Sequence, residues 1–145
     1  MHRTVDVAYG AKEKRRKIIN QGSDYVIINY DGVEIVAEDI ANGGFDCIIV
    51  DEATHYKNAQ TKRWKTLNKL LTDQTWLWMM TGTPAAQSPL DAYGIAKLVN
   101  PAAVPRFFGS FRDMVMYKVT NFKWKPKETA TETVYNALQP AIRFT

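Results

Sequence analysis

Cysteine, histidine and long apolar runs are scarce in this chain of 145 residues, and each shortage excludes a class of protein. The single Cys47 rules out a disulfide framework and a metal site built on several thiolates. The two histidines, His2 and His55, lack partners at zinc-ligand spacing. No apolar stretch approaches the ~20 residues of a membrane span, and no signal-peptide pattern opens the chain. We therefore expect an intracellular protein without a membrane partner.

A phosphate-binding loop is also missing. None of the eight glycines is followed by lysine, so the pattern G-x-x-x-x-G-K-[ST] cannot be formed. Such a loop surrounds the phosphates of a nucleotide with backbone N–H groups and a lysine. We expect this chain alone to bind a nucleoside triphosphate poorly.

The overall composition is that of an ordinary globular domain. Apolar residues make up 46% of the chain and charged residues 23%, which is enough apolar surface for one core. The formal net charge of +4 fits a nucleic-acid partner, although many soluble proteins share a mild excess of base.

Four β-rich runs alternate with helical patterns over the first hundred residues. The strand patterns cover 5–9, 24–31, 45–52 and 75–82, and the helical patterns cover 11–21, 33–44, 61–71 and 89–101. Strands that are apolar on both faces and alternate with helices predict an α/β fold, with a parallel sheet and helices on both faces. Trp76 and Trp78 would then lie in the sheet core. The loops after Asn29, Val50 and Met80 would share one edge of the sheet, where such folds bind ligands.

The pattern weakens beyond Pro101. Residues 107–119 are expected to be helical, 122–131 to form a polar loop, and 132–145 to begin a helix that the chain end cuts short. Lysines at 118, 123, 125 and 127 interleave with Phe122 and Trp124, which is compatible with a stacking and charge surface. An ordinary surface loop with the aromatic rings tucked beneath it is the interpretation we favour.

The strongest local signal is the run CIIVDEATHYKN, residues 47–58. Asp51, at the tip of an apolar strand, is placed to hold Mg²⁺ against the phosphates of a nucleotide. Glu52 is placed to orient or deprotonate an attacking water. The alternative is a strand that simply ends in polar residues, which cap the next segment.

A second signal follows one helical crossover later. The strand WLWMM leads into TGTPAAQ, residues 81–87, where two threonine hydroxyls flank a glycine. These hydroxyls can bond the acidic pair and thereby sense a γ-phosphate. In isolation the same residues also fit a plain turn before a helix.

Together these two motifs resemble motifs II and III of the Swi/Snf-like branch of superfamily-2 helicases. IINYDGV resembles an earlier DNA-contacting motif of that branch, and LQPAIRFT the segment that leads into its second motor lobe. The resemblance implies a partial RecA-like lobe of the P-loop NTPase type over residues 1–101. Residues 102–145 would form a helical and loop extension toward an absent second lobe.

The resemblance assigns roles residue by residue. It implies catalytic roles for Asp51, which would bind Mg²⁺ through the nucleotide, and for Glu52. Thr54, which stands where the family usually has His or Gln, would belong with Thr81, Gly82 and Thr83 to the nucleotide-sensing group. The implied nucleic-acid contacts are Asn29, Tyr30, Lys57 and Asn58.

The implied function is a fragment of an ATP-dependent translocase that acts on double-stranded DNA, with ATP and Mg²⁺ as cofactors of the complete motor. An upstream phosphate-loop segment and a second lobe, which separate chains could supply, would complete it. The isolated chain is expected to be inactive. The alternative is a non-catalytic binding module or decoy that docks on nucleic acid or a partner protein. That alternative predicts an exposed apolar flank where absent strands would pair.

Overall fold

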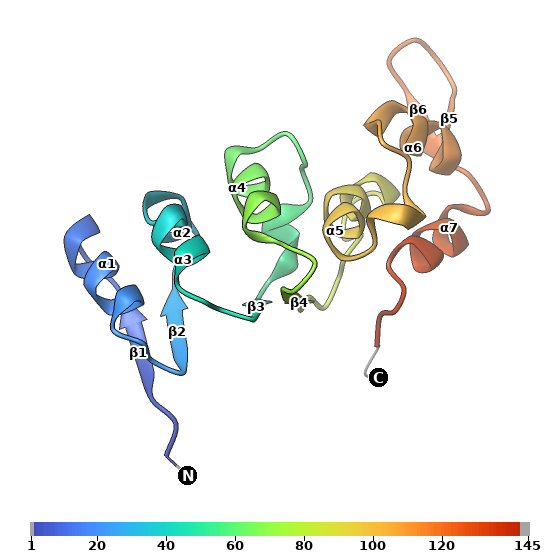
Figure 1. Cartoon of the computed structure of the whole chain (residues 1–145). Coiled ribbons are helices and arrows are strands. Elements are labelled where there is room, and N and C mark those ends of the chain that lie inside the picture. Colours follow the sequence, from blue (N-terminus) through green and yellow to red (C-terminus); the bar gives the residue numbers. More distant parts are fainter. Residues whose placement is uncertain (1, 143–145) are drawn as a thin grey trace. The chain divides into compact units, whose positions relative to one another are not determined.

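The computed structural model describes residues 2–142, in which short strands and helices follow one another along the chain (Figure 1). The strands are β1 (Val5–Ala8), β2 (Tyr25–Ile28), β3 (Cys47–Val50), β4 (Trp76–Met79), β5 (Met116–Lys118) and β6 (Trp124–Pro126). The helices are α1 (Lys12–Asn20), α2 (Tyr30–Ile35), α3 (Ala37–Asn42), α4 (Lys62–Leu70), α5 (Ala92–Val99), α6 (Phe108–Val115) and α7 (Ala130–Ala137). Short 3₁₀ turns are η1 (Ala53–Tyr56), η2 (Pro89–Asp91) and η3 (Pro101–Ala103).

The chain divides into two compact units. The first comprises residues up to 48 together with 61–76, and the second comprises 49–60 together with the residues from 77 onward. The alternation of strands and helices confirms the expected α/β class. Within the described residues the strands pair only two by two, as β1–β2, β3–β4 and β5–β6, so the single larger sheet that we expected is absent there.

In the first unit, β1 and β2 form a parallel pair whose two faces differ. Ala8 packs with Ile19 of α1 and Val36 in a small core on one face. The register pairs Val5 with Tyr25 and Val7 with Ile27. These four side chains form the other face, and each is more than half exposed. The expectation of helices on both faces is therefore wrong for the described residues, which cover one face of this pair only.

Trp76 and Trp78 do not lie in a core. Their exposed fractions are 71% and 60%, and Met80 on the same side of the chain is half exposed. The apolar run was correctly read as a strand. The burial of its side chains was not predicted correctly. An apolar pattern indicates that a strand face is apolar, but it does not indicate whether other residues of the same chain cover that face.

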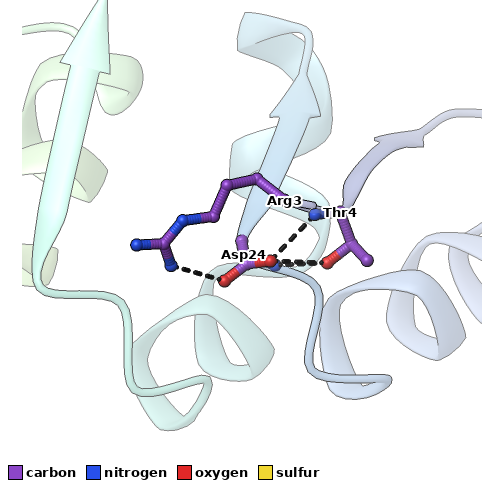
Figure 2. Close-up of polar contacts among 3 residues, drawn as sticks. All are labelled: Arg3, Thr4 and Asp24. Carbon is purple, nitrogen blue, oxygen red and sulfur yellow. Dashed lines mark hydrogen bonds and ion pairs between the residues drawn. The ribbon is translucent and has the colours of Figure 1, made fainter. Parts of the chain in front are cut away.

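A polar cluster ties together the amino ends of β1 and β2 (Figure 2). One carboxylate oxygen of Asp24 accepts hydrogen bonds from the Thr4 amide at 2.8 Å and the Thr4 hydroxyl at 3.0 Å. Arg3 donates to the other oxygen at 3.0 Å. The Thr4 amide, followed by the Arg3 and Thr4 side chains, holds the pKa of the Asp24 carboxyl below its usual value. The cluster fixes where the two strands begin.

Element boundaries differ from expectation in two places within this unit. The strand pattern 24–31 ends at Ile28, because Asn29 is the N-terminal cap of α2 and Tyr30 is its first residue. The helical pattern 33–44 is divided between α2 and α3 at Val36, whose φ of −123° is not helical. Val36 is nevertheless buried, as its apolar spacing indicated.

The second unit has its core among α5, α6, α7 and the hairpin β5–β6. Tyr93, Phe111, Val115 and Met116 are among its buried residues. Our expectations for this region were wrong in part: residues 116–118 are a strand and not the end of a helix, and the supposed polar loop contains β6. The last helix, α7, ends at Ala137 and is not cut by the chain end, while residues 143–145 lie outside the described residues. None of the helices in the described part is long and apolar enough to span a membrane.

Candidate functional site

The acidic pair lies just beyond β3, where the backbone departs from regular strand geometry. The Met80 amide donates to the Val50 carbonyl at 2.9 Å, and the Met80 carbonyl accepts from the Ala53 amide at 2.8 Å. In a regular parallel ladder one residue bonds two residues that are two positions apart on the neighbouring strand, whereas Met80 bonds residues three positions apart. The extra residue is accommodated because Glu52 adopts a left-handed conformation with φ of 53°, alone among the described non-glycine residues. Such a conformation costs about 1–2 kcal/mol and is concentrated at functional sites.

The Glu52 carboxylate connects the acidic box to the segment after β4. Its Oε1 atom accepts hydrogen bonds from the Thr54 hydroxyl at 2.8 Å and from the Thr81 hydroxyl at 3.2 Å. The Thr81 oxygen in turn accepts from the Thr83 amide at 3.2 Å. The hydroxyls of Thr54 and Thr81, both predicted to belong to the nucleotide-sensing group, therefore bond the same carboxylate oxygen. Thr83, another member of that group, bonds Thr81 through its backbone amide.

Asp51 and Glu52 are both exposed at this end of the strand. One Asp51 oxygen accepts the Glu52 amide at 3.0 Å, which orients the carboxylate. The described residues contain no group of three or more His, Cys, Asp or Glu side chains suited to a metal ion. Mg²⁺ commonly takes only one or two carboxylates and completes its shell with nucleotide phosphates and water. The oxygen donors present therefore fit a Mg²⁺ ion that arrives with ATP.

The segment after the acidic pair packs closely against α5. Ala53 and Tyr56 of η1 are fully or almost fully buried. The Gly94 amide donates to the Lys57 carbonyl at 3.1 Å. A Cβ atom on Gly94 would lie 2.3 Å from the carbonyl oxygens of both Tyr56 and Lys57. Only glycine at position 94 permits so close an approach of α5 to this loop. The approach positions the segment that follows the acidic pair.

Lys57 and Asn58, the predicted nucleic-acid contacts after the box, are exposed. The Lys57 ammonium lies 3.5 Å from an Asp91 carboxylate oxygen. The Asn58 side chain accepts the Gln60 amide at 2.9 Å and so closes a local turn. These contacts place both residues beside the acidic box and give each a structural role.

Asn29 and Tyr30 lie in the first unit, where two arginines hold them. Arg15 donates through Nη1 to the Asn29 side-chain oxygen at 2.8 Å. The Arg63 guanidinium lies 5.1 Å from the centre of the Tyr30 ring and pairs with Asp31 at 2.9 Å. The strand end that carries the predicted contacts thus has two arginines beside it, one of which is paired with Asp31.

Arg15 is the functional-region residue that sequence reasoning missed. It is 7% exposed and also donates to the Ala8 carbonyl at 2.8 Å and the Gly10 carbonyl at 2.7 Å. A Cβ atom on Gly32 would lie 2.2 Å from its Nη1 atom. Arg15 lies within the charged run KEKRR, residues 12–16, whose composition gives no sign of burial. Only the helical phase, three residues before the apolar Ile18 and four before Ile19, marks Arg15 as the inward member of that run.

Gly82, in contrast, is sterically unconstrained. It is exposed, and a Cβ atom built on it would meet no heavy atom within 4 Å. The fold therefore does not require glycine at this position of the TGTP segment.

The fold and this geometry define an α/β protein with an acidic strand-end site that is bonded to a neighbouring threonine motif. Residues 2–142 match the SNF2-related domain, and the chain belongs to that family. This confirms the resemblance to the Swi/Snf-like helicase branch.

Two relatives are both named SWI/SNF-related matrix-associated actin-dependent regulator of chromatin subfamily A-like protein 1. The Xenopus laevis protein is 35% identical over 81 residues, and the Xenopus tropicalis protein is 33% identical over 81 residues. Each match covers 56% of this chain and 8% of the relative, so the chain corresponds to a small part of those proteins.

Proposed function

We propose that this chain supplies the Mg²⁺-binding and water-activating half of a RecA-like ATPase lobe, in a motor that translocates on double-stranded DNA. The observation that carries the proposal is the convergence of the Thr54 and Thr81 hydroxyls on Glu52 Oε1. A structural cap does not require a carboxylate in a left-handed conformation that is bonded by hydroxyls from two different segments. Membership of the SNF2-related family supports the same conclusion.

Each residue has a distinct role in this proposal. Asp51 would hold Mg²⁺, which neutralises charge on the transferred phosphoryl group when ATP is bound. Glu52 would orient the attacking water and accept its proton through the oxygen that the threonines do not bond. Thr81 would be a positioning residue, because it acts on the water only through Glu52.

The position of Thr54 modifies the coupling relative to the family pattern. In this chain Thr81 reaches Glu52 directly, at 3.2 Å, without a histidine or glutamine between them. Thr54 shares the same carboxylate oxygen and limits the rotation of Glu52. We propose that movement of the TGTP segment on DNA binding changes the orientation of Glu52 through this bond.

Asn29 and Tyr30 form the proposed duplex contact, with Lys57 and Asn58 as further contacts. Lys57 has an exposed ammonium group, and Arg15 fixes the orientation of the Asn29 amide. Backbone phosphates are the expected target, because Lys and Asn side chains are common phosphate ligands.

The test is to add a phosphate-loop segment upstream and measure ATP turnover with and without duplex DNA. The proposal predicts DNA-stimulated turnover that falls by about 10²–10⁴ in Glu52→Gln, the usual contribution of a positioned base. Glu132→Gln is a matched control, because Glu132 is an exposed carboxylate in the first turn of α7. Unchanged turnover in Glu52→Gln would refute the assignment.

A second candidate function is a binding module without catalysis. The observation that favours it is the exposed apolar strand face formed by Val5, Val7, Tyr25 and Ile27. Such a face is unusual in a monomer and marks a surface covered by other polypeptide. If the chain is monodisperse alone and no upstream segment restores turnover, this function replaces the motor.

A further inference from the structure

The hairpin β5–β6 combines a high density of positive charge with exposed aromatic rings. Residues 116–127 contain four lysines and no aspartate or glutamate. The register pairs Tyr117 with Lys125 and Lys118 with Trp124. Because paired residues share a face, each face of the hairpin carries one aromatic ring beside one lysine.

One face is occupied by contacts with α6. The Arg112 guanidinium lies 4.2 Å from the centre of the Trp124 ring, and Met116 is buried. At the base of the hairpin, the Lys127 ammonium donates to the Asp113 carbonyl at 2.6 Å. These contacts fix the hairpin on the helix beside which it lies in Figure 1.

The other face and the tip are open to solvent. Tyr117 and Val119 are almost half exposed, and Lys123 and Lys125 lie on the same face by strand alternation. Within the described residues, Lys123 and Lys125 have no carboxylate within ion-pair distance. This surface therefore carries positive charge that the chain itself does not neutralise.

Phe122, at the tip, is 97% exposed. Hydrogen bonds hold the backbone of this turn. The Phe122 amide donates to the Thr120 hydroxyl at 3.3 Å, and the Val119 amide donates to the Lys123 carbonyl at 2.8 Å. The turn thus presents a bare aromatic ring that has no packing role in the described fold. The interpretation of an ordinary loop with its aromatic rings tucked beneath is wrong for Phe122.

We propose that this hairpin is a second nucleic-acid contact, in which Phe122 stacks on an unpaired base while Lys123 and Lys125 bind flanking phosphates. Uncompensated lysines match a polyanion, and exposed rings among basic residues are typical of single-strand binding surfaces. The bases of an intact duplex are already stacked on each other, so the ring favours single-stranded nucleic acid. The proposal concerns a surface remote in sequence from the acidic box and requires no ATP hydrolysis.

The test measures binding of the whole 145-residue chain to a fluorescent single-stranded oligothymidine and to a duplex, by anisotropy over a range of salt. Phe122→Ala is expected to weaken single-strand binding roughly fivefold to a hundredfold, the usual contribution of one stacked base. The loss for duplex should be smaller. Lys123→Gln and Lys125→Gln should each reduce the slope of log K against log salt by about 0.7, one released counterion.

Two matched controls separate this surface from general effects. Tyr135→Ala removes an aromatic side chain that is 63% exposed on α7, and Lys69→Gln removes an exposed lysine of α4. Both should bind as the wild type does. Absent single-strand binding, hairpin variants within twofold of wild type, or preferential binding to anionic phosphatidylserine vesicles would each overturn the inference. Loss of ATP turnover in Glu52→Gln leaves this measurement unaffected, so the two proposals fail separately.

Discussion

Substitution of Gly94 by alanine is the sharpest structural test of how the acidic box is held. The new Cβ atom would lie 2.3 Å from the carbonyl oxygens of Tyr56 and Lys57, whereas real Cβ atoms essentially never come within 3.0 Å of a heavy atom outside their own and adjacent residues. Both obstacles are backbone atoms, so no side-chain rotation relieves the clash. Either α5 or the segment after the box must move, and the hydrogen bond from the Gly94 amide to the Lys57 carbonyl must lengthen.

The magnitude follows from these two effects. Overpacking costs about 1–3 kcal/mol, and loss of the hydrogen bond about 1 kcal/mol more. The free energy of unfolding should fall by about 2–4 kcal/mol, a large part of the ~5–15 kcal/mol that stabilises most domains. For a chain of this size the expected decrease in Tm is roughly 5–15 °C.

The assay is thermal and urea unfolding followed by circular dichroism, with Gly109→Ala as the control. A Cβ atom on Gly109, in α6, would meet nothing within 4 Å. This control should match the wild type or gain up to ~1 kcal/mol from helix propensity. A Gly94→Ala variant as stable as the Gly109→Ala variant would refute the close approach of α5 to the acidic-box segment.

Two further predictions concern the first unit. Arg15→Met should lower the free energy of unfolding by about 3 kcal/mol, because the substitution leaves the buried Ala8 carbonyl without a charged donor. Arg15→Lys should recover only part of that loss. Equal stability of the wild type and Arg15→Met in urea would contradict this prediction. Asp24→Asn should destabilise the chain at neutral pH by an amount that shrinks in acid. The lowered pKa of Asp24 means that its contribution is complete above the unfolded value near 4 and is lost as pH falls through the folded pKa. Urea titrations at pH 3 and pH 7 measure this, and a difference that grows in acid would show the sign to be wrong.

The order of strands and helices over the first hundred residues was predictable because each segment carries its own apolar period. The end of β3 just before the acidic pair and the N-terminal cap of α4 at Thr61 follow from local chemistry, and the Thr61 hydroxyl indeed accepts a hydrogen bond from the Trp64 amide. The proximity of the two motifs also followed, because parallel strands bring their carboxyl ends to one edge.

Other features required tertiary information. The left-handed conformation of Glu52 is imposed by the Met80 bonds on either side of it, which no local pattern records. The three-residue strands of the β5–β6 hairpin are too short to show a period, and Arg112 stabilises them through Trp124. The exposure of Trp76 and Trp78 was also unpredictable, since apolar strands look alike whether or not their own chain covers them.

The central claim is that Glu52 and Thr81 act as one unit in ATP hydrolysis, and a double-mutant cycle tests it most directly. Single-turnover hydrolysis on duplex DNA would be measured for the motor completed with an upstream phosphate-loop segment, as wild type, Glu52→Gln, Thr81→Val and the double variant. Because Thr81 is proposed to act only through the carboxylate, Thr81→Val should slow the wild type and have no further effect on Glu52→Gln. Independent, multiplicative losses of rate would contradict the account.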